Sequence, residues 1–190
     1  MSLSTQTEFE ERLLSFYNDV NACALEPTKW SWETTATLFS KQSYLKKTAF
    51  VLLETRLNEA EADETVEEDQ DPASAYALPA QQTVQLEHHI VYSTSYQVPV
   101  LYFRAFYLDG TPLSQDEIYQ SIVPKSQQDV ALSQSDHPLL GTPYWYIHPC
   151  QTRTAMETVQ FEKQDYIKTW LSIFGPPVQC QLPLAMFLKS

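Results

Sequence analysis

A cysteine that could act as a nucleophile lies in the tripeptide His148-Pro149-Cys150, directly after the aromatic run at residues 144–147. Pro149 fixes its own backbone φ and stiffens the approach to the thiol. A thiol at the point where an apolar segment breaks into a loop can be held rigidly and still be reached by a substrate. A lone cysteine is more often a small buried hydrophobe, so the chemistry depends on its surroundings.

Several side chains near Cys150 could assist a reaction there. His148 precedes it by two residues, so in an extended segment both side chains point the same way. The imidazole could lower the pKa of the thiol or shape the loop through a backbone hydrogen bond, and we expect the second role. Thr152 could donate its hydroxyl to an oxyanion or cap the turn after the cysteine. Tyr144 and Tyr146 are further candidate donors to an oxyanion.

Asp136 and His137 might combine with Cys150 into a Cys–His–Asp hydrolase. However, His137 precedes Pro138 at the start of a loop, and no papain-like or caspase-like signature accompanies these residues. We therefore expect a different class of cysteine chemistry.

The three cysteines, Cys23, Cys150 and Cys180, are widely spaced. An odd, dispersed set argues against a disulfide framework and favours a reducing, cytoplasmic location. Without a Cys-x-x-Cys motif or paired histidine ligands we expect no zinc, no other metal and no cofactor. No stretch of about eighteen apolar residues and no signal peptide pattern is present, so we expect no transmembrane segment.

Length and charge narrow the class further. A chain of 190 residues with 43% hydrophobic content suits a single globular domain over residues 1–190. The net charge of −12 argues against nucleic-acid binding. Residues 54–71 hold nine acidic residues and one basic residue, a net charge of −8. We expect an acidic, mobile loop at about 56–80; steering of a basic partner is the alternative.

Hydrophobic periodicity predicts the elements that position Cys150. These are a helix over 5–24, strands around 30–32 and over 44–53, 84–92 and 98–107, a short helix from 114, an extended segment over 144–148 and a helix over 164–174. The polar residues 124–136 are expected to be irregular, and the apolar tail 182–188 is expected to pack. Connections between the strands are too short for helical crossovers, which indicates an antiparallel meander flanked by helices, an α+β fold.

Three blocks of sequence occur in order along the second half of the chain. They are residues 137–152 (HPLLGTPYWYIHPCQT), residues 87–110, which include EHHIVYS and SYQVPVLYFRA, and residues 170–177 (WLSIFGPP). Together they resemble the autophagy-related protein 10 family of E2-like enzymes, whereas the first 80 or so residues match only loosely.

The resemblance implies an E2-like fold, here with an antiparallel meander, and a cysteine acyltransferase. Cys150 would accept the ubiquitin-like modifier, autophagy-related protein 12, as a thioester from an E1-like enzyme, autophagy-related protein 7. It would then transfer the modifier to a lysine of the acceptor, autophagy-related protein 5, in support of autophagosome formation. The implied location is the cytoplasm, with transient presence at the forming autophagosome membrane.

The resemblance also implies direct contact with the acceptor, for which His88, His89 and Tyr96 are candidates. The two histidines lie on opposite faces of a strand, so we expect one to face a buried surface and the other solvent or a partner. His88 stands where the family commonly has an aromatic residue such as tyrosine. Outward aromatics of the strand from Tyr96 to Tyr107 could pair with the acceptor by strand addition at a sheet edge.

Ubiquitin E2 enzymes place an asparagine before the nucleophile, whereas all asparagines here lie in the N-terminal third (Asn18, Asn21 and Asn58). An oxyanion donor would therefore be a backbone N–H, Thr152, a tyrosine or a group of the acceptor. Two alternatives remain open. One is the sister enzyme that transfers a modifier to phosphatidylethanolamine, whose motif resembles His-Pro-Cys-x-His, with Thr152 here at the second histidine. The other is a catalytically silent E2-like binding module.

Overall fold

A single antiparallel sheet of six strands forms the centre of the protein, in the order β1-β2-β3-β4-β6-β5. The computed structural model describes residues 3, 5–23, 29–36, 41–54 and 81–188. Its strands are β1 (Trp30–Ala36), β2 (Lys41–Glu54), β3 (Gln81–Ser93), β4 (Val98–Tyr107), β5 (Leu132–Asp136) and β6 (Pro143–Ile147). The first four pair in sequence order, which confirms the predicted meander and the α+β fold. The acidic segment 56–80 lies outside the described residues.

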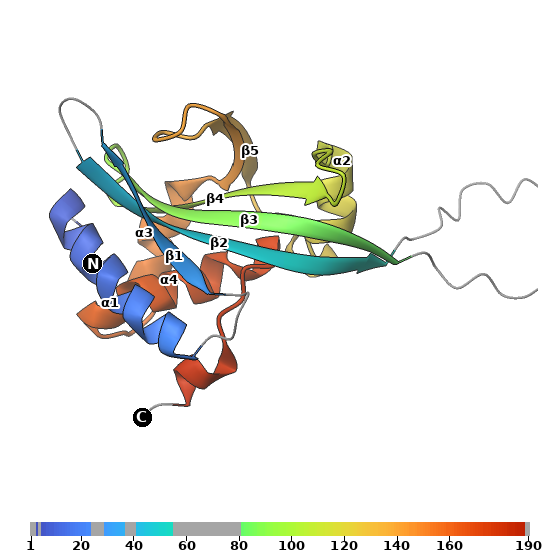
Figure 1. Cartoon of the computed structure of the whole chain (residues 1–190). Coiled ribbons are helices and arrows are strands. Elements are labelled where there is room, and N and C mark those ends of the chain that lie inside the picture. Colours follow the sequence, from blue (N-terminus) through green and yellow to red (C-terminus); the bar gives the residue numbers. More distant parts are fainter. Residues whose placement is uncertain (1–2, 4, 24–28, 37–40, 55–80, 189–190) are drawn as a thin grey trace, which may run out of the picture.

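The helices α1 (Gln6–Cys23) and α4 (Tyr166–Phe174) pack against each other on one face of this sheet (Figure 1). The short helix α3 (Thr152–Glu157) contacts α4, and α2 (Gln115–Glu117) runs into a π-helical turn over Ile118–Ile122. The helix α1 begins where Thr5 Oγ1 accepts the N–H of Glu8 at 3.1 Å, an N-cap arrangement. Its buried face consists of Phe9, Leu13, Phe16 and Val20, the three- and four-residue spacing that predicted it.

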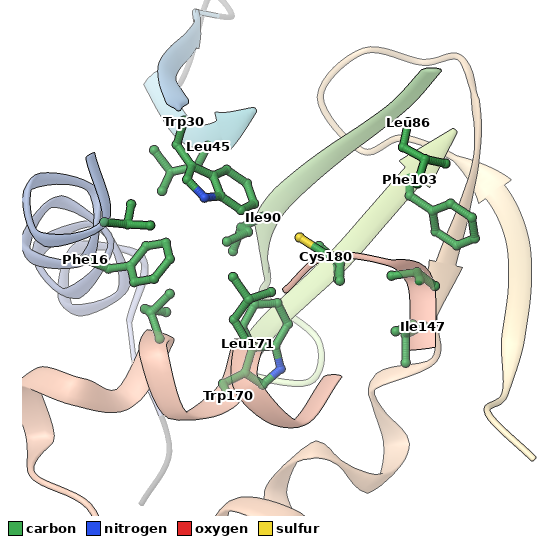
Figure 2. Close-up of a cluster of buried hydrophobic side chains, with 14 of the residues drawn as sticks. Phe16, Trp30, Leu45, Leu86, Ile90, Phe103, Ile147, Trp170, Leu171 and Cys180 are labelled. Carbon is green, nitrogen blue, oxygen red and sulfur yellow. The ribbon is translucent and has the colours of Figure 1, made fainter. Parts of the chain in front are cut away.

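The hydrophobic core lies between α1, α4 and the inner face of the sheet (Figure 2). Phe16 meets Trp30 edge to face, with ring centroids 6.1 Å apart. Trp170 and Leu171 of α4 are 1% and 0% exposed. Cys180 is also fully buried here, and burial raises the pKa of its thiol to about 11. This cysteine is therefore a core residue, without thiolate character at neutral pH.

One prediction about an irregular segment needs correction. Residues 124–136 contain a 3-10 turn (Lys125–Gln127) and the strand β5, not irregular chain. The strand was missed because β5 is an edge strand with mostly exposed polar side chains, so hydrophobic alternation is absent. The tail packs through Leu182 and Met186, whereas Leu184 and Leu188 are 73% exposed.

The histidines of β3 are both buried, at 0% and 1% exposure, so the expectation that one faces solvent is wrong. His88 faces the helices and donates from Nε2 to the carbonyl oxygen of Val178 at 2.8 Å. His89 lies on the opposite face, where its Nδ1 is 3.1 Å from Nε2 of His137. The turn that begins at His137 covers this part of the outer face, which sequence spacing did not reveal.

A polar cluster on the outer face surrounds the carboxylate of Glu87. Tyr144 donates its hydroxyl to Oε1 at 2.7 Å, Arg104 donates to the same oxygen at 2.8 Å, and Lys46 lies 2.6 Å from Oε2. Burial alone would raise the pKa of Glu87, but these donors and His89 together hold it well below its usual range. The sheet thus carries a paired charge on one face and an apolar core on the other.

The partners of the two outer-face histidines determine their tautomers. His137 accepts the N–H of Leu139 at Nδ1, so in the neutral ring Nε2 carries the proton and donates to His89. His89 then carries its proton on Nε2, 3.4 Å from Oε1 of Glu87. Burial, together with the neighbouring His89 ring and the charge of Arg104, lowers the pKa of His137 to about 3. Both rings are therefore neutral in the folded protein at neutral pH.

These histidines should make the fold sensitive to mild acid. The unfolded chain binds a proton on His137 below about pH 6.5, whereas the folded chain resists until about pH 3, so stability falls as the pH falls through this window. Between pH 7 and 5.5, His137→Gln should lose less stability than the parent protein, by about 1 kcal/mol. Urea unfolding at both pH values measures this; equal losses would contradict it.

Gly175 should be intolerant of a side chain. A Cβ at this position would lie 2.2 Å from the carbonyl oxygen of Cys180 and 2.6 Å from that of Leu171, and neither backbone atom can move freely. Gly175→Ala should lower the free energy of unfolding by at least about 2 kcal/mol. Gly110→Ala is the matched control, because a Cβ at Gly110 would meet no atom within 4 Å. Only the positive φ of 88° opposes this substitution, and it should lower the free energy of unfolding by about 1 kcal/mol. Similar losses in urea unfolding would refute the steric argument.

Candidate active site

Cys150 follows β6 at one end of the sheet. β6 pairs with β5 through five residue pairs, from Asp136↔Pro143 to Leu132↔Ile147, but with β4 through only Tyr102↔Tyr146 and Phe103↔Trp145. Beyond the strand, the N–H of His148 donates to the carbonyl of Ala131 at 3.0 Å. This bond extends the pairing to the last residue before Pro149.

A 3-10 turn over Pro149–Gln151 then holds the cysteine. His148 caps the turn, because its Nδ1 accepts the N–H of Cys150 at 3.2 Å. The backbone N–H of Thr152 bonds to the carbonyl of Pro149, and α3 begins at Thr152. The geometry matches the loop-shaping role expected for His148, in which a ring nitrogen is occupied by the backbone.

The thiol of Cys150 is exposed, whereas Cys23 is half-buried and Cys180 is buried. A hollow of about 200 Å³ opens beside Cys150. Its apolar lining comes from Val130, Ala131, Ile147, Ile173, Phe174 and Pro177. The site therefore combines a reachable sulfur with a partly apolar recess, two requirements for accepting a peptide-borne acyl group.

Aromatic rings flank His148 on its other side. Its imidazole lies against Tyr96, with centroids 5.6 Å apart, and 6.1 Å from the ring of Tyr146. Tyr96 does not lie in a strand but in the turn before β4, where Gln97 adopts a φ of 56°. The structure thus brings together Cys150, His148, Tyr146 and Tyr96, of which Tyr96 had been assigned only to acceptor recognition.

Other candidate residues are engaged elsewhere. Tyr144 is buried and donates to Glu87, so its hydroxyl is not directed at Cys150. Thr152 is 2% exposed and, within the described residues, its side chain has no hydrogen bond; its backbone closes the turn instead. His88 and His89 are buried in β3, where neither ring presents a surface to an acceptor.

The expectation that an acceptor adds a strand alongside β4 is wrong, because β4 is not an edge strand of the sheet. β4 lies between β3 and β6, and the edges of the sheet are β1 and β5. In the described part of the chain, no group of three histidine, cysteine or acidic side chains could hold a metal ion. Among those same residues, no helix is both long enough and apolar enough to cross a bilayer.

Comparison with known proteins shows which family the chain matches. Residues 8–185 match the family model described as "Autophagocytosis associated protein, active-site domain". The human protein named "Ubiquitin-like-conjugating enzyme ATG10" is 40% identical over 118 residues, which cover 56% of this chain and 54% of that protein. The protein of that name from Arabidopsis thaliana is 28% identical over 187 residues, covering 83% of each chain. The chain spans about half the length of the human relative and of that from Dictyostelium discoideum, with 53% of the latter covered.

Two solved structures share the fold. The solution structure of KmAtg10 has a TM-score of 0.50 at 18% identity, and the match covers 96% of this chain and 99% of KmAtg10. A crystal structure described as "Autophagic E2, Atg10" has a TM-score of 0.50 at 17% identity, with 92% and 95% covered. At these identities the likeness establishes the fold alone, which is E2-like. Together with the family match, it shows that this chain belongs to the autophagocytosis-associated family, as a member of its autophagy-related protein 10 branch.

Proposed function

We propose that the protein is an E2-like transferase that carries a ubiquitin-like modifier as a thioester on Cys150. The observation that carries this proposal is an exposed thiol, fixed by a capped turn beside a partly apolar hollow. The match to an active-site domain over most of the chain supports it. A protein that only binds would not need its thiol held in this way.

Two acyl transfers make up the proposed reaction. In the first, the thiolate of Cys150 attacks the carbonyl carbon of the modifier's C-terminal glycine, and the C–S bond to the E1-like enzyme breaks. One thioester replaces another, so positioning matters more than driving force. In the second, the neutral amine of an acceptor lysine attacks the same carbonyl. The C–N bond forms, Cys150 leaves as a thiolate, and the surplus proton of the amine passes to solvent.

The specific partners are part of this proposal. The modifier would be autophagy-related protein 12, the E1-like enzyme autophagy-related protein 7 and the acceptor autophagy-related protein 5, acting in the cytoplasm and transiently at the forming autophagosome. Relatives named ATG10 from human and Arabidopsis thaliana support this choice. His148, Tyr146 and Tyr96 would shape the site around Cys150, since their rings lie together there.

The lipid-conjugating branch is a second candidate. "Autophagy-related protein 3" from Pichia angusta is 34% identical over 71 residues, 37% of this chain and 21% of that protein. Thr152 stands where that branch has a histidine, which favours a protein acceptor. Offering the charged enzyme the acceptor protein or phosphatidylethanolamine vesicles separates these two, and a catalytically silent module would take no modifier at all.

A serine at position 150 should trap the intermediate. With an E1-like enzyme, ATP and the modifier, the parent protein should form an adduct that thiol reductant removes. Cys150→Ser should form an oxyester that survives reductant, because a hydroxyl replaces the sulfur as the acyl carrier, and gel electrophoresis with and without reductant distinguishes them. Cys23→Ser is the matched control and should retain the reductant-sensitive adduct. An adduct that persists in Cys150→Ala, or none in the parent, would overturn the proposal.

Two substitutions should separate the structural and chemical roles of His148. His148→Asn keeps a side chain that favours N-caps, whereas His148→Ala removes the acceptor for the Cys150 N–H, a loss of about 1 kcal/mol. The rate of thioester formation should therefore fall about three- to tenfold in His148→Ala and much less in His148→Asn. Equal loss of about a hundredfold in both would indicate a proton-transfer role instead.

A further inference from the structure

The hollow beside Cys150 contains an acidic side chain in otherwise neutral surroundings. Asp129 lines it together with Gln127, Gln151 and the apolar residues named above. No lysine or arginine is among the described residues that line it. The recess next to the sulfur thus offers an apolar wall and a carboxylate, which suits a cation on an aliphatic stem.

Backbone bonds hold the segment that follows Asp129 in the chain. β5 and β6 pair so that Leu132 stands opposite Ile147, and the His148 N–H continues the same register to Ala131. Asp129 lies in the turn that leads into β5, and it lines the same hollow as Cys150. The segment is held from within as well, because Val130 donates its N–H to the carbonyl of Gln127 at 3.1 Å.

The carboxylate of Asp129 is exposed and available. Within the described residues it has no hydrogen bond or ion pair, unlike Glu87, whose carboxylate is fully engaged. Asp129 is not needed for any contact that holds the turn, since those bonds come from the His148 ring and backbone groups.

We propose that this hollow receives the lysine side chain of the acceptor and that Asp129 binds its ammonium group. The inference rests on the proposed transferase function and adds the subsite for the attacking nucleophile. The aliphatic stem lies along the apolar wall formed by Val130 and Ile173, and the nitrogen is held next to the thioester carbonyl on Cys150. After the ammonium loses one proton to water, the amine attacks and the C–N bond forms. The C–S bond breaks, Cys150 leaves as a thiolate, and the second proton of the amine passes to solvent. Asp129 is a substrate-binding residue in this step.

The test is a chase of the charged enzyme with two nucleophiles. The protein is loaded with the modifier by the E1-like enzyme and ATP, the loading is stopped, and equal amounts of thioester are exposed to free lysine or to hydroxylamine. Lysine arrives as an ammonium ion, whereas hydroxylamine is uncharged at neutral pH. Asp129→Asn should lower the second-order rate constant for lysine about fivefold, the scale of an exposed ion pair. Its rate with hydroxylamine should change less than about twofold.

Two further variants sharpen the test. Asp129→Glu keeps the charge and should recover most of the lysine rate. Asp136→Asn removes an exposed carboxylate at the far end of β5, outside the hollow, and should react with both nucleophiles as the parent does. Together they separate the charge at position 129 from the net charge of the protein.

Each contrary result has a clear meaning. Equal slowing of lysine and hydroxylamine in Asp129→Asn would assign Asp129 to the shape of the site and overturn the inference. An unchanged lysine rate would overturn it as well. A parent thioester that reacts with hydroxylamine but not with lysine would remove the subsite while leaving the thioester function intact, whereas a parent protein that takes no modifier would overturn both.

Discussion

The hydrogen bond from the N–H of His148 to the carbonyl of Ala131 is the contact on which the site depends. It carries the pairing of β5 and β6 to the residue that precedes Pro149, so the chain enters the turn that holds Cys150 from a fixed position. The His148 ring is therefore already positioned to accept the hydrogen bond from the Cys150 N–H. The same bond ends at Ala131, and residues 129–131 line the hollow together with Cys150.

The two faces of the sheet are stabilised in different ways. The inner face buries aliphatic and aromatic side chains against α1 and α4. The hydrophobic effect that stabilises this face does not depend on the direction of individual contacts. The outer face buries Glu87 with Arg104, Lys46 and Tyr144 around it. A buried charge is stable only with such partners. Removal of a partner would leave the charge uncompensated.

The sequence predicted those parts of the fold that have local signals. Periodicity identified α1 and α4, alternation identified β3, and the His148-Pro149-Cys150 motif identified the exposed thiol. The strand β5 was missed because its side chains are polar at a sheet edge. Contacts between distant residues were also missed, such as His89 with His137 and Tyr96 with His148. Such contacts depend on how turns fold over the sheet, which short-range patterns do not encode.

The short pairing between β4 and β6 has a consequence for the position of Cys150. With only two residue pairs joining them, backbone bonds contribute little to fastening the β5–β6 ribbon to the rest of the sheet. Side chains contribute to that attachment, through Tyr144 with Glu87, His137 with His89 and the burial of Ile147 in the core. The thiol at one end of the ribbon is thus anchored by ionisable groups at the other. The position of the segment that carries the thiol therefore depends on these polar contacts as well as on the burial of Ile147 in the core.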